Sequence, residues 1–286
     1  MRDYVILTDS GTDLSAEMAK ELDITILDLM VIMDDDPTPK PNSSVDAREF
    51  YEFLRSKHTA TTSAVNTDAF AEEMEKAIND GKDVIYLGFS SGLSNTFNAG
   101  RIAAEELSEK YPDSKIYAID TLCASLGEGL LVYLAAKKKQ AGATIDELRD
   151  YIEATKLHLC HWFTVEDLMF LKRGGRVSAA TAVVGTMLSI KPVMHVDNAG
   201  KLIKMGTARG RKASIDSLFE KTKATVTDTE VMFICHGDCI DDAKYLAERL
   251  KNELGVKEVF IDYTGVVIGS HSGPGTLAVF YIGTER

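Results

Sequence analysis

Basic residues are scarce in this sequence, and the shortage excludes one broad class of function. Its 286 residues contain 32 Lys and Arg against 44 Asp and Glu, so the formal net charge at pH 7 is −12. A protein that binds nucleic acid or an anionic membrane surface through charge needs the opposite balance. We therefore expect no nucleic-acid partner.

Long apolar runs and paired cysteines are also missing. No stretch of 18 uncharged apolar residues occurs, so no segment predicts a transmembrane helix, and the first nine residues lack the apolar core of a signal peptide. The 4 cysteines are scattered without the spacing of a disulfide framework. Together these absences predict a cytoplasmic protein.

Common signatures of catalysis and cofactor binding are absent too. The sequence has no Gly-x-Ser-x-Gly elbow, no Walker loop and no Gly-x-Gly-x-x-Gly after the first strand. His158 and His161 could share one face of a helix, but no second pair of ligands completes a zinc site. We expect no catalytic residues, no metal and no cofactor, hence a binding protein and not an enzyme.

The first half of the chain alternates short apolar runs with amphipathic segments. Apolar run 84–89 precedes a helix that starts near residue 96, and run 115–119 precedes helix 125–139. This rhythm is typical of a parallel sheet with helices on its faces. The later half shows hairpin signals and fewer helices, which favours an α+β architecture. We predict an α/β domain over 1–160 and an α+β domain over 161–286, and the chain length allows both.

Several segments are expected to be irregular. The charged, proline-rich stretch 34–41 follows a single expected strand, 24–33, and suits neither a strand nor a helix. Polar turns are expected at 59–63 and at 270–275.

The most informative polar turn is Gly88 to Thr96, where a buried strand leads into a helix. It offers the side chains of Ser91, Ser94 and Asn95 beside free backbone N–H groups. The start of a helix carries a partial positive charge and unpaired donors, so it can bind an anion. Simple helix capping by Ser or Asn is the alternative.

Two other segments could converge on the same anion. Thr62 and Ser63 lie in the polar turn after the second helix, and His271 is held between Gly and Pro residues. Imidazole can donate a hydrogen bond or titrate near neutral pH. Each feature alone is more often structural, because hydroxyl-rich turns and lone histidines are common.

Two further segments suggest phosphate chemistry. Arg173 and Arg176 cluster around two glycines, which indicates either a solvated turn or a fixed cationic patch for a phosphate or an acidic partner. Asp9-Ser10-Gly11-Thr12 is similar to the first phosphate loop of sugar kinases and actin-like ATPases. The next residues predict a helix where those proteins have a hairpin, so a phosphotransferase is only an alternative.

A series of short motifs runs in order from the first expected strand to the last. They are Thr8-Asp9-Ser10 with Asp13-Leu14, Thr62-Ser63, Ser90 to Ser94, Asp120-Thr121, Phe163 to Gly175, Lys191-Pro192 and Gly269 to Gly275. Each is weak alone, but the ordered set resembles the DegV family of bacterial fatty-acid-binding proteins, of the fatty acid kinase B type.

This resemblance implies a long-chain fatty acid in a tunnel between two domains. Its carboxylate would be bound by Thr62 or Ser63, by the turn from Ser91 through Ser94 to Asn95, and by His271. A separate fatty acid kinase subunit would phosphorylate the acid, facing Arg173, Arg176 and Arg209, and contact with a membrane or an acyltransferase would be transient. Asn95 stands where the family usually has Gly, and Ala64-Val65-Asn66 replaces its usual Gln-Pro-Ser.

Overall fold

A parallel sheet organises the N-terminal half of the molecule. The computed structural model describes residues 2–178, 189–284 and 286. Within them the first sheet has four strands that pair in parallel, in the order β2 (Ile24–Leu27), β1 (Tyr4–Asp9), β6 (Asp83–Gly88) and β7 (Ile116–Asp120). All six residues of β6 are buried, as expected for a central strand with both faces covered.

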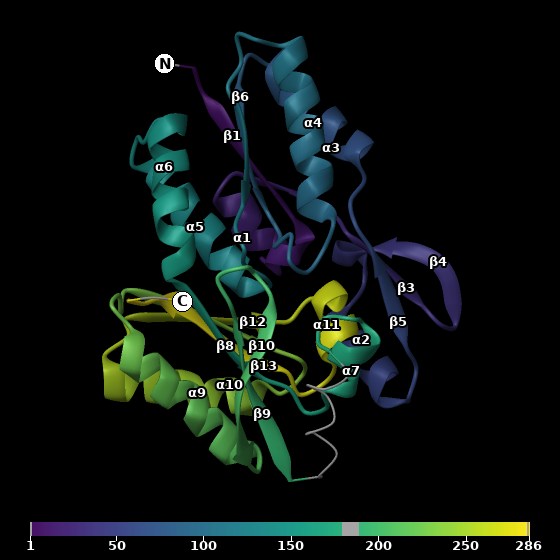
Figure 1. Ribbon diagram of the computed structural model, residues 1–286, viewed down its shortest axis with the longest axis vertical. Coiled ribbons are helices and arrows are strands. Elements are labelled where there is room, and N and C mark those ends of the chain that lie inside the picture. The colour runs from purple at the N-terminus through teal and green to yellow at the C-terminus, as the bar shows by residue number, and fades with distance from the viewer. Residues whose placement is uncertain (1, 179–188, 285) are drawn as a thin grey trace.

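Helices cover both faces of this sheet (Figure 1). Packing on one face involves α1 (Ala16–Glu21), α5 (Leu126–Gln140) and α6 (Ile145–Thr155). The other face packs against α3 (Thr67–Asn79) and α4 (Thr96–Lys110). In α3, Phe70, Met74 and Ile78 are buried because a spacing of four residues places them on one helix face.

A small antiparallel sheet projects from the side of this domain (Figure 1). Its order is β4 (Asp36–Pro41), β3 (Met30–Met33) and β5 (Ala60–Ser63), with α2 (Ala47–Arg55) between β4 and β5 in sequence. The predicted irregular stretch 34–41 is therefore wrong. Its three prolines fall at alternate positions of an edge strand. The N–H groups at such positions point away from the neighbouring strand, so their absence removes no hydrogen bond of the sheet. The single strand expected over 24–33 splits into β2 and β3, which join different sheets.

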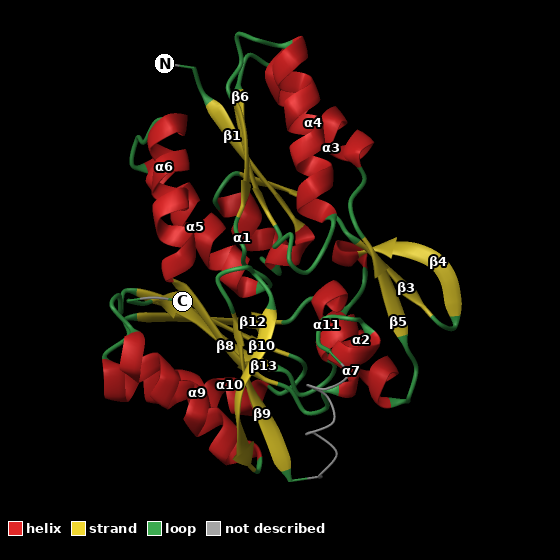
Figure 2. Ribbon diagram, viewed as in Figure 1, coloured by secondary structure: helices red, strands yellow, loops and turns green. Residues whose placement is uncertain are grey.

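The C-terminal half forms a second, mixed sheet (Figure 2). Its order in the described residues is β10 (Leu202–Arg209), β9 (Ile190–Val196), β8 (Leu159–Thr164), β13 (Leu277–Ile282), β11 (Val231–His236) and β12 (Glu258–Tyr263). The pair β11 and β12 is parallel, and the other pairs are antiparallel. Helices α9 (Arg211–Thr225) and α10 (Ile240–Leu254) pack against one face.

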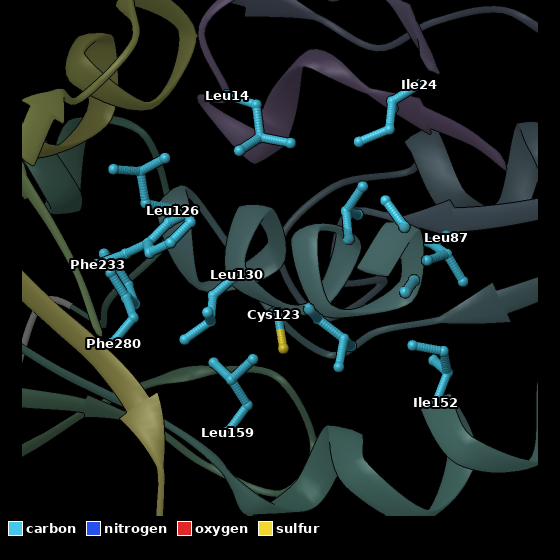
Figure 3. Packing of buried hydrophobic residues seen from close by; sticks show 14 of the residues in the cluster. Leu14, Ile24, Leu87, Cys123, Leu126, Leu130, Ile152, Leu159, Phe233 and Phe280 are labelled. Atoms are coloured by element: carbon cyan, nitrogen blue, oxygen red, sulfur yellow. The ribbon is translucent and has the colours of Figure 1, made fainter. Parts of the chain in front are cut away.

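The opposite face of the second sheet packs on α5 of the first domain. Leu126 and Leu130 of α5 lie against Phe233 and Phe280 of the sheet in one continuous core (Figure 3). The predicted class, a parallel α/β domain followed by an α+β domain, is confirmed. Within the described residues, no helix has the length and apolar character needed to cross a membrane.

Two short helices complete the contact between the domains. They are α7 (Met169–Arg173) and α11 (Val266–Ser272), and they pack on each other. His271 therefore lies in the last turn of α11, not in the loop expected over 270–275. Short 3-10 helices occupy Ser10–Thr12, Asn42–Ser44 and Lys156–His158.

Candidate functional site

A cavity lies between the two domains. The cavity has a volume of about 200 Å³. One buried water needs only about 10–15 Å³ when it is measured in the same way, so the cavity has room for a much larger molecule. Most of its wall is apolar and is contributed by both domains: Leu29, Phe89 and Leu93 from the first, and Phe163, Val196, Leu202, Ala278 and Phe280 from the second. Such a space suits an elongated apolar molecule better than a charged one.

Most of the polar residues predicted for the site line this cavity. They are Thr62, Ser63, Ser94, Asn95, Arg176 and His271. Three others do not line it. Ser91 is exposed, Arg209 is exposed at the end of β10, and Arg173 lines a neighbouring pocket.

The turn before α4 is held in place by buried hydrogen bonds. Ser90 Oγ donates to Gly200 O at 2.8 Å, so this turn of the first domain is fastened to the β9–β10 hairpin of the second. Ser94 Oγ accepts from the N–H of Thr96 at 3.2 Å and lies 2.9 Å from Thr96 Oγ1. Ser94 thus binds the first N–H of α4 and also lines the cavity, whereas the N-cap residue Asn95 makes no side-chain capping hydrogen bond.

The carboxylate of Asp9 also holds this turn in place through hydrogen bonds. Asp9 is fully buried, and its carboxylate accepts from the Tyr86 hydroxyl at 2.8 Å and from the N–H groups of Phe89 and Gly11 at 3.0 Å each. Burial raises the pKa of Asp9 to about 6. The segment from Asp9 to Thr12 is entirely buried, so it is not exposed as the phosphate loop of a phosphotransferase would be.

Thr62 and His271 meet at the mouth of the cavity. Thr62 Oγ1 on β5 lies 2.8 Å from His271 Nε2 on α11. Burial, together with the nearby Arg176 guanidinium, lowers the pKa of His271 to about 4, so the ring is neutral at pH 7. A Cβ on residue Gly174 would lie 2.1 Å from His271 Nδ1, which explains why glycine is needed where α7 ends against this ring.

A second pocket adjoins the first. This pocket has a volume of about 380 Å³ and shares Thr62, Arg176 and His271 with the cavity. Arg173 lies in this outer pocket, with its guanidinium 4.6 Å from the centre of the Phe170 ring. Arg176 is half-buried, and its Nε donates to Leu93 O at 3.1 Å. Two cationic side chains therefore line the pocket that adjoins the apolar cavity.

The two histidines considered for a metal site do not share a helix. His158 ends a 3-10 turn, and His161 is on β8, where its ring faces the cavity. His161 Nε2 accepts from Ala124 N at 3.3 Å, and burial holds the pKa of His161 well below its usual range. Among the described residues, no three His, Cys, Asp or Glu side chains are grouped closely enough to hold a metal ion.

Sequence reasoning missed a further set of polar groups on the cavity wall: Ser125, Cys235, Thr264, Ser272 and Thr276. They come from three parts of the chain, at residue 125, at residue 235 and over 264–276, so no local pattern marks the whole set as neighbours. The register of the second sheet brings two of these segments together, because Cys235 of β11 pairs with Ala278, two residues after Thr276.

Comparisons with known proteins agree with this arrangement. A family model described as "Uncharacterised protein, DegV family COG1307" matches residues 3–284. A DegV domain-containing protein of Clostridium perfringens (strain 13 / Type A) is 45% identical over 289 residues, which cover 100% of this chain and 99% of that relative. A DegV lipid-binding protein from Thermotoga maritima has a TM-score of 0.85 at 28% identity, covering 99% of both chains. A DegV family protein from Thermus thermophilus, described for its fatty acid binding, has a TM-score of 0.87 at 27% identity, covering 99% of this chain and 100% of the other. This chain belongs to the DegV family.

Proposed function

We propose that this protein holds one long-chain fatty acid in the cavity between its domains and presents the carboxylate to a separate fatty acid kinase subunit. The observation that carries the proposal is the apolar cavity whose mouth is lined by Thr62, Ser63 and Ser94 and opens beside the cationic outer pocket. The Thermotoga and Thermus relatives, described as binding lipid and fatty acid respectively, support the ligand class.

The energetics of such a ligand fit the cavity. Burying roughly 15 methylenes at about 0.8 kcal/mol each gives a gross gain of about 12 kcal/mol, from which the cost of ordering the ligand is subtracted. The carboxylate must then be hydrogen-bonded, because an unpaired buried charge is very costly. Hydroxyls of Thr62, Ser63 and Ser94 and the amide of Asn95 offer donors at the mouth. His271, neutral at pH 7, offers an N–H without adding a charge.

The outer pocket is suited to the next step. In this proposal the carboxylate faces the outer pocket, where the kinase subunit transfers the terminal phosphoryl group of a nucleoside triphosphate to a carboxylate oxygen. The acyl phosphate forms and the nucleoside diphosphate leaves. Arg173 and Arg176 would stabilise the added negative charge. The proposal places the protein in the cytoplasm, from which the acid or its acyl phosphate passes to an acyltransferase or a membrane.

Ligand binding is tested first with the protein as purified from bacterial cells. Native mass spectrometry should detect one fatty acid per chain, and delipidated protein should bind oleate or palmitate at micromolar concentration. Ser94→Ala should weaken binding by about 1–3 kcal/mol, because it leaves the carboxylate short of a donor. Ser91→Ala is the matched control, since that hydroxyl is exposed and outside the cavity. If delipidated protein binds neither acid, the proposal is wrong.

Presentation to the kinase needs a separate readout. Arg173→Ala should leave fatty acid affinity unchanged, because Arg173 does not line the cavity, and should slow phosphorylation of the bound acid by a fatty acid kinase subunit. Arg209→Ala tests the remaining arginine, which lies in neither pocket and should change the rate less. Equal phosphorylation rates for Arg173→Ala and the parent protein would remove Arg173 from the presenting surface.

A further inference from the structure

Five polar side chains of the cavity that were not predicted for the carboxylate site form a wall of their own. We call Ser125, Cys235, Thr264, Ser272 and Thr276 the inner polar wall. Cys235 Sγ lies 3.3 Å from Ser125 Oγ and 3.1 Å from Thr264 Oγ1. All five side chains line the cavity and are at least nine-tenths buried. The methylene groups of a plain hydrocarbon chain form no hydrogen bonds with such a surface, so these polar side chains indicate a different group on the ligand.

One member of the inner polar wall lacks a partner. Ser272 is 5% exposed, and within the described part of the chain its Oγ makes no hydrogen bond. The other hydroxyls are engaged: Ser125 donates to Asp13, Thr264 to Cys235, and Thr276 to Gly273 O at 2.8 Å. A buried hydroxyl without a partner is costly, so Ser272 should meet a polar atom when the cavity is filled.

The wall begins beside the mouth of the cavity and extends away from it: Ser272 directly follows His271, but Ser272 lines only the cavity, whereas His271 also lines the outer pocket. Thr264 precedes α11 and His271 lies in its last turn, and the five helical steps from Val266 to His271 alone span about 7.5 Å at 1.5 Å per residue. Thr264 would therefore contact an acyl chain several methylenes below a carboxylate held at the mouth.

The hydrogen-bonding capacity of the wall selects the kind of atom it accepts. Its engaged hydroxyls keep acceptor lone pairs, and Ser272 can both donate and accept. Asp13 stands directly behind Ser125, and no cation belongs to the wall, so a second carboxylate would be repelled. A neutral hydroxyl can donate to one wall oxygen and accept from Ser272, which satisfies both partners.

We propose that the preferred ligand is a long-chain fatty acid with a hydroxyl group on its chain, bound at the inner polar wall through Ser272. The proposal rests on the proposed function, because it assumes that the carboxylate occupies the mouth. The hydroxyl pairs a buried side chain that a plain fatty acid leaves unpaired. A hydroxy acid of matching position should therefore bind about tenfold more tightly than the plain acid of equal length.

The test compares stearic acid with positional isomers of monohydroxystearic acid. Delipidated protein is titrated with each acid by displacement of a fluorescent fatty acid. One or more isomers should bind about tenfold more tightly than stearic acid. Ser272→Ala should abolish this gain and leave stearic acid affinity unchanged or higher. Ser108→Ala is the control, because that hydroxyl donates to Ala104 O on α4, outside the cavity, and it should preserve the gain.

The outcomes separate this proposal from the proposed function. If stearic acid binds but no isomer binds more tightly, the inner polar wall does not select a hydroxyl and only this proposal is overturned. An equal loss for every acid in Ser272→Ala would also overturn it, by assigning Ser272 to the carboxylate. If no acid binds, the proposed function fails as well. Should Ser272→Ala misfold, the isomer series on the unmodified protein decides the question by itself.

Discussion

Gly92→Ala tests whether contact between the two domains shapes the mouth of the cavity. A Cβ at residue Gly92 would lie 2.6 Å from Ala199 O and 2.9 Å from Gly200 O. Both oxygens belong to the backbone of the β9–β10 hairpin, so no side chain can rotate away. Relief requires the turn and the hairpin to separate by roughly half an ångström or more, and overpacking of this kind costs about 1–3 kcal/mol.

The same shift should reach the carboxylate site. Ser90 Oγ donates to Gly200 O at 2.8 Å, so separation of the turn from the hairpin stretches this hydrogen bond. Ser94 is two residues after Gly92 and moves with the turn. We expect the affinity for a fatty acid to fall about fivefold to tenfold, since part of one hydrogen bond to the carboxylate is lost.

Two measurements on one pair of variants check this reasoning. Chemical unfolding gives the change in stability, and displacement of a fluorescent fatty acid gives the change in affinity. Gly206→Ala is the matched control, because its added Cβ meets no atom within 4 Å and its φ is not positive. An affinity in Gly92→Ala equal to that of Gly206→Ala would refute the idea that the hairpin positions the turn.

Three other substitutions test the buried polar groups. Burial raises the pKa of Asp13 to about 7, so its native form binds more protons than the unfolded chain between about pH 4 and pH 7, and stability is lost as the pH rises through that window. The free energy of unfolding of Asp13→Asn, measured in urea relative to that of the parent protein, should therefore rise by about 2–3 kcal/mol from pH 5 to pH 8. A difference between the two proteins that stays constant over this pH range would contradict the expectation. Arg286 donates to carbonyls on both sides of the domain boundary, so Arg286→Ala should lower the free energy of unfolding by about 1–3 kcal/mol. The control Arg101→Ala, at a side chain that is largely exposed, should change the free energy of unfolding by less than about 1 kcal/mol. Equal losses of stability in the two variants would mean that Arg286 does not help to join the domains. Tyr86→Phe removes a donor from the buried Asp9 carboxylate and should cost about 1–3 kcal/mol by chemical unfolding, whereas unchanged stability would mean that the two N–H donors suffice.

Elements with complete local signals could be predicted from the sequence. Helix α3, Thr67–Asn79, has such signals, because Asn66 caps it and its apolar residues repeat at the helical spacing. The strand predicted over 84–89 is β6, shifted by one residue, and the run without charged residues that follows Asp83 matches its burial on both faces. In these segments the local pattern and the tertiary environment favour the same structure.

Elements defined by distant partners could not be predicted in this way. Strand β8, Leu159–Thr164, mixes Cys, His and Trp without alternation, and its neighbours β13 and β9 come much later in the chain. Helix α11 is seven residues long and ends at Gly273, so sequence alone favoured a loop. It is stabilised by packing on α7 and α2, contacts that no local pattern predicts.

The candidate site likewise contains residues that a local sequence pattern marks and residues that only the fold brings together. Ser94 and Thr62 could be selected from the sequence because hydroxyl-bearing residues surround them, although Thr62 lies on strand β5 and not in the polar turn expected over 59–63. The inner polar wall could not be selected in this way, because Ser125 and Cys235 lie far in sequence from Thr264, Ser272 and Thr276. The wall exists only when α5 packs between the two sheets, since Ser125 precedes α5 and Cys235 belongs to the sheet below it. The cavity and the domain interface therefore share their residues. A ligand that binds only the closed interface must stabilise the native protein in proportion to its occupancy, so the fatty acid is expected to act as part of the hydrophobic core that joins the two domains.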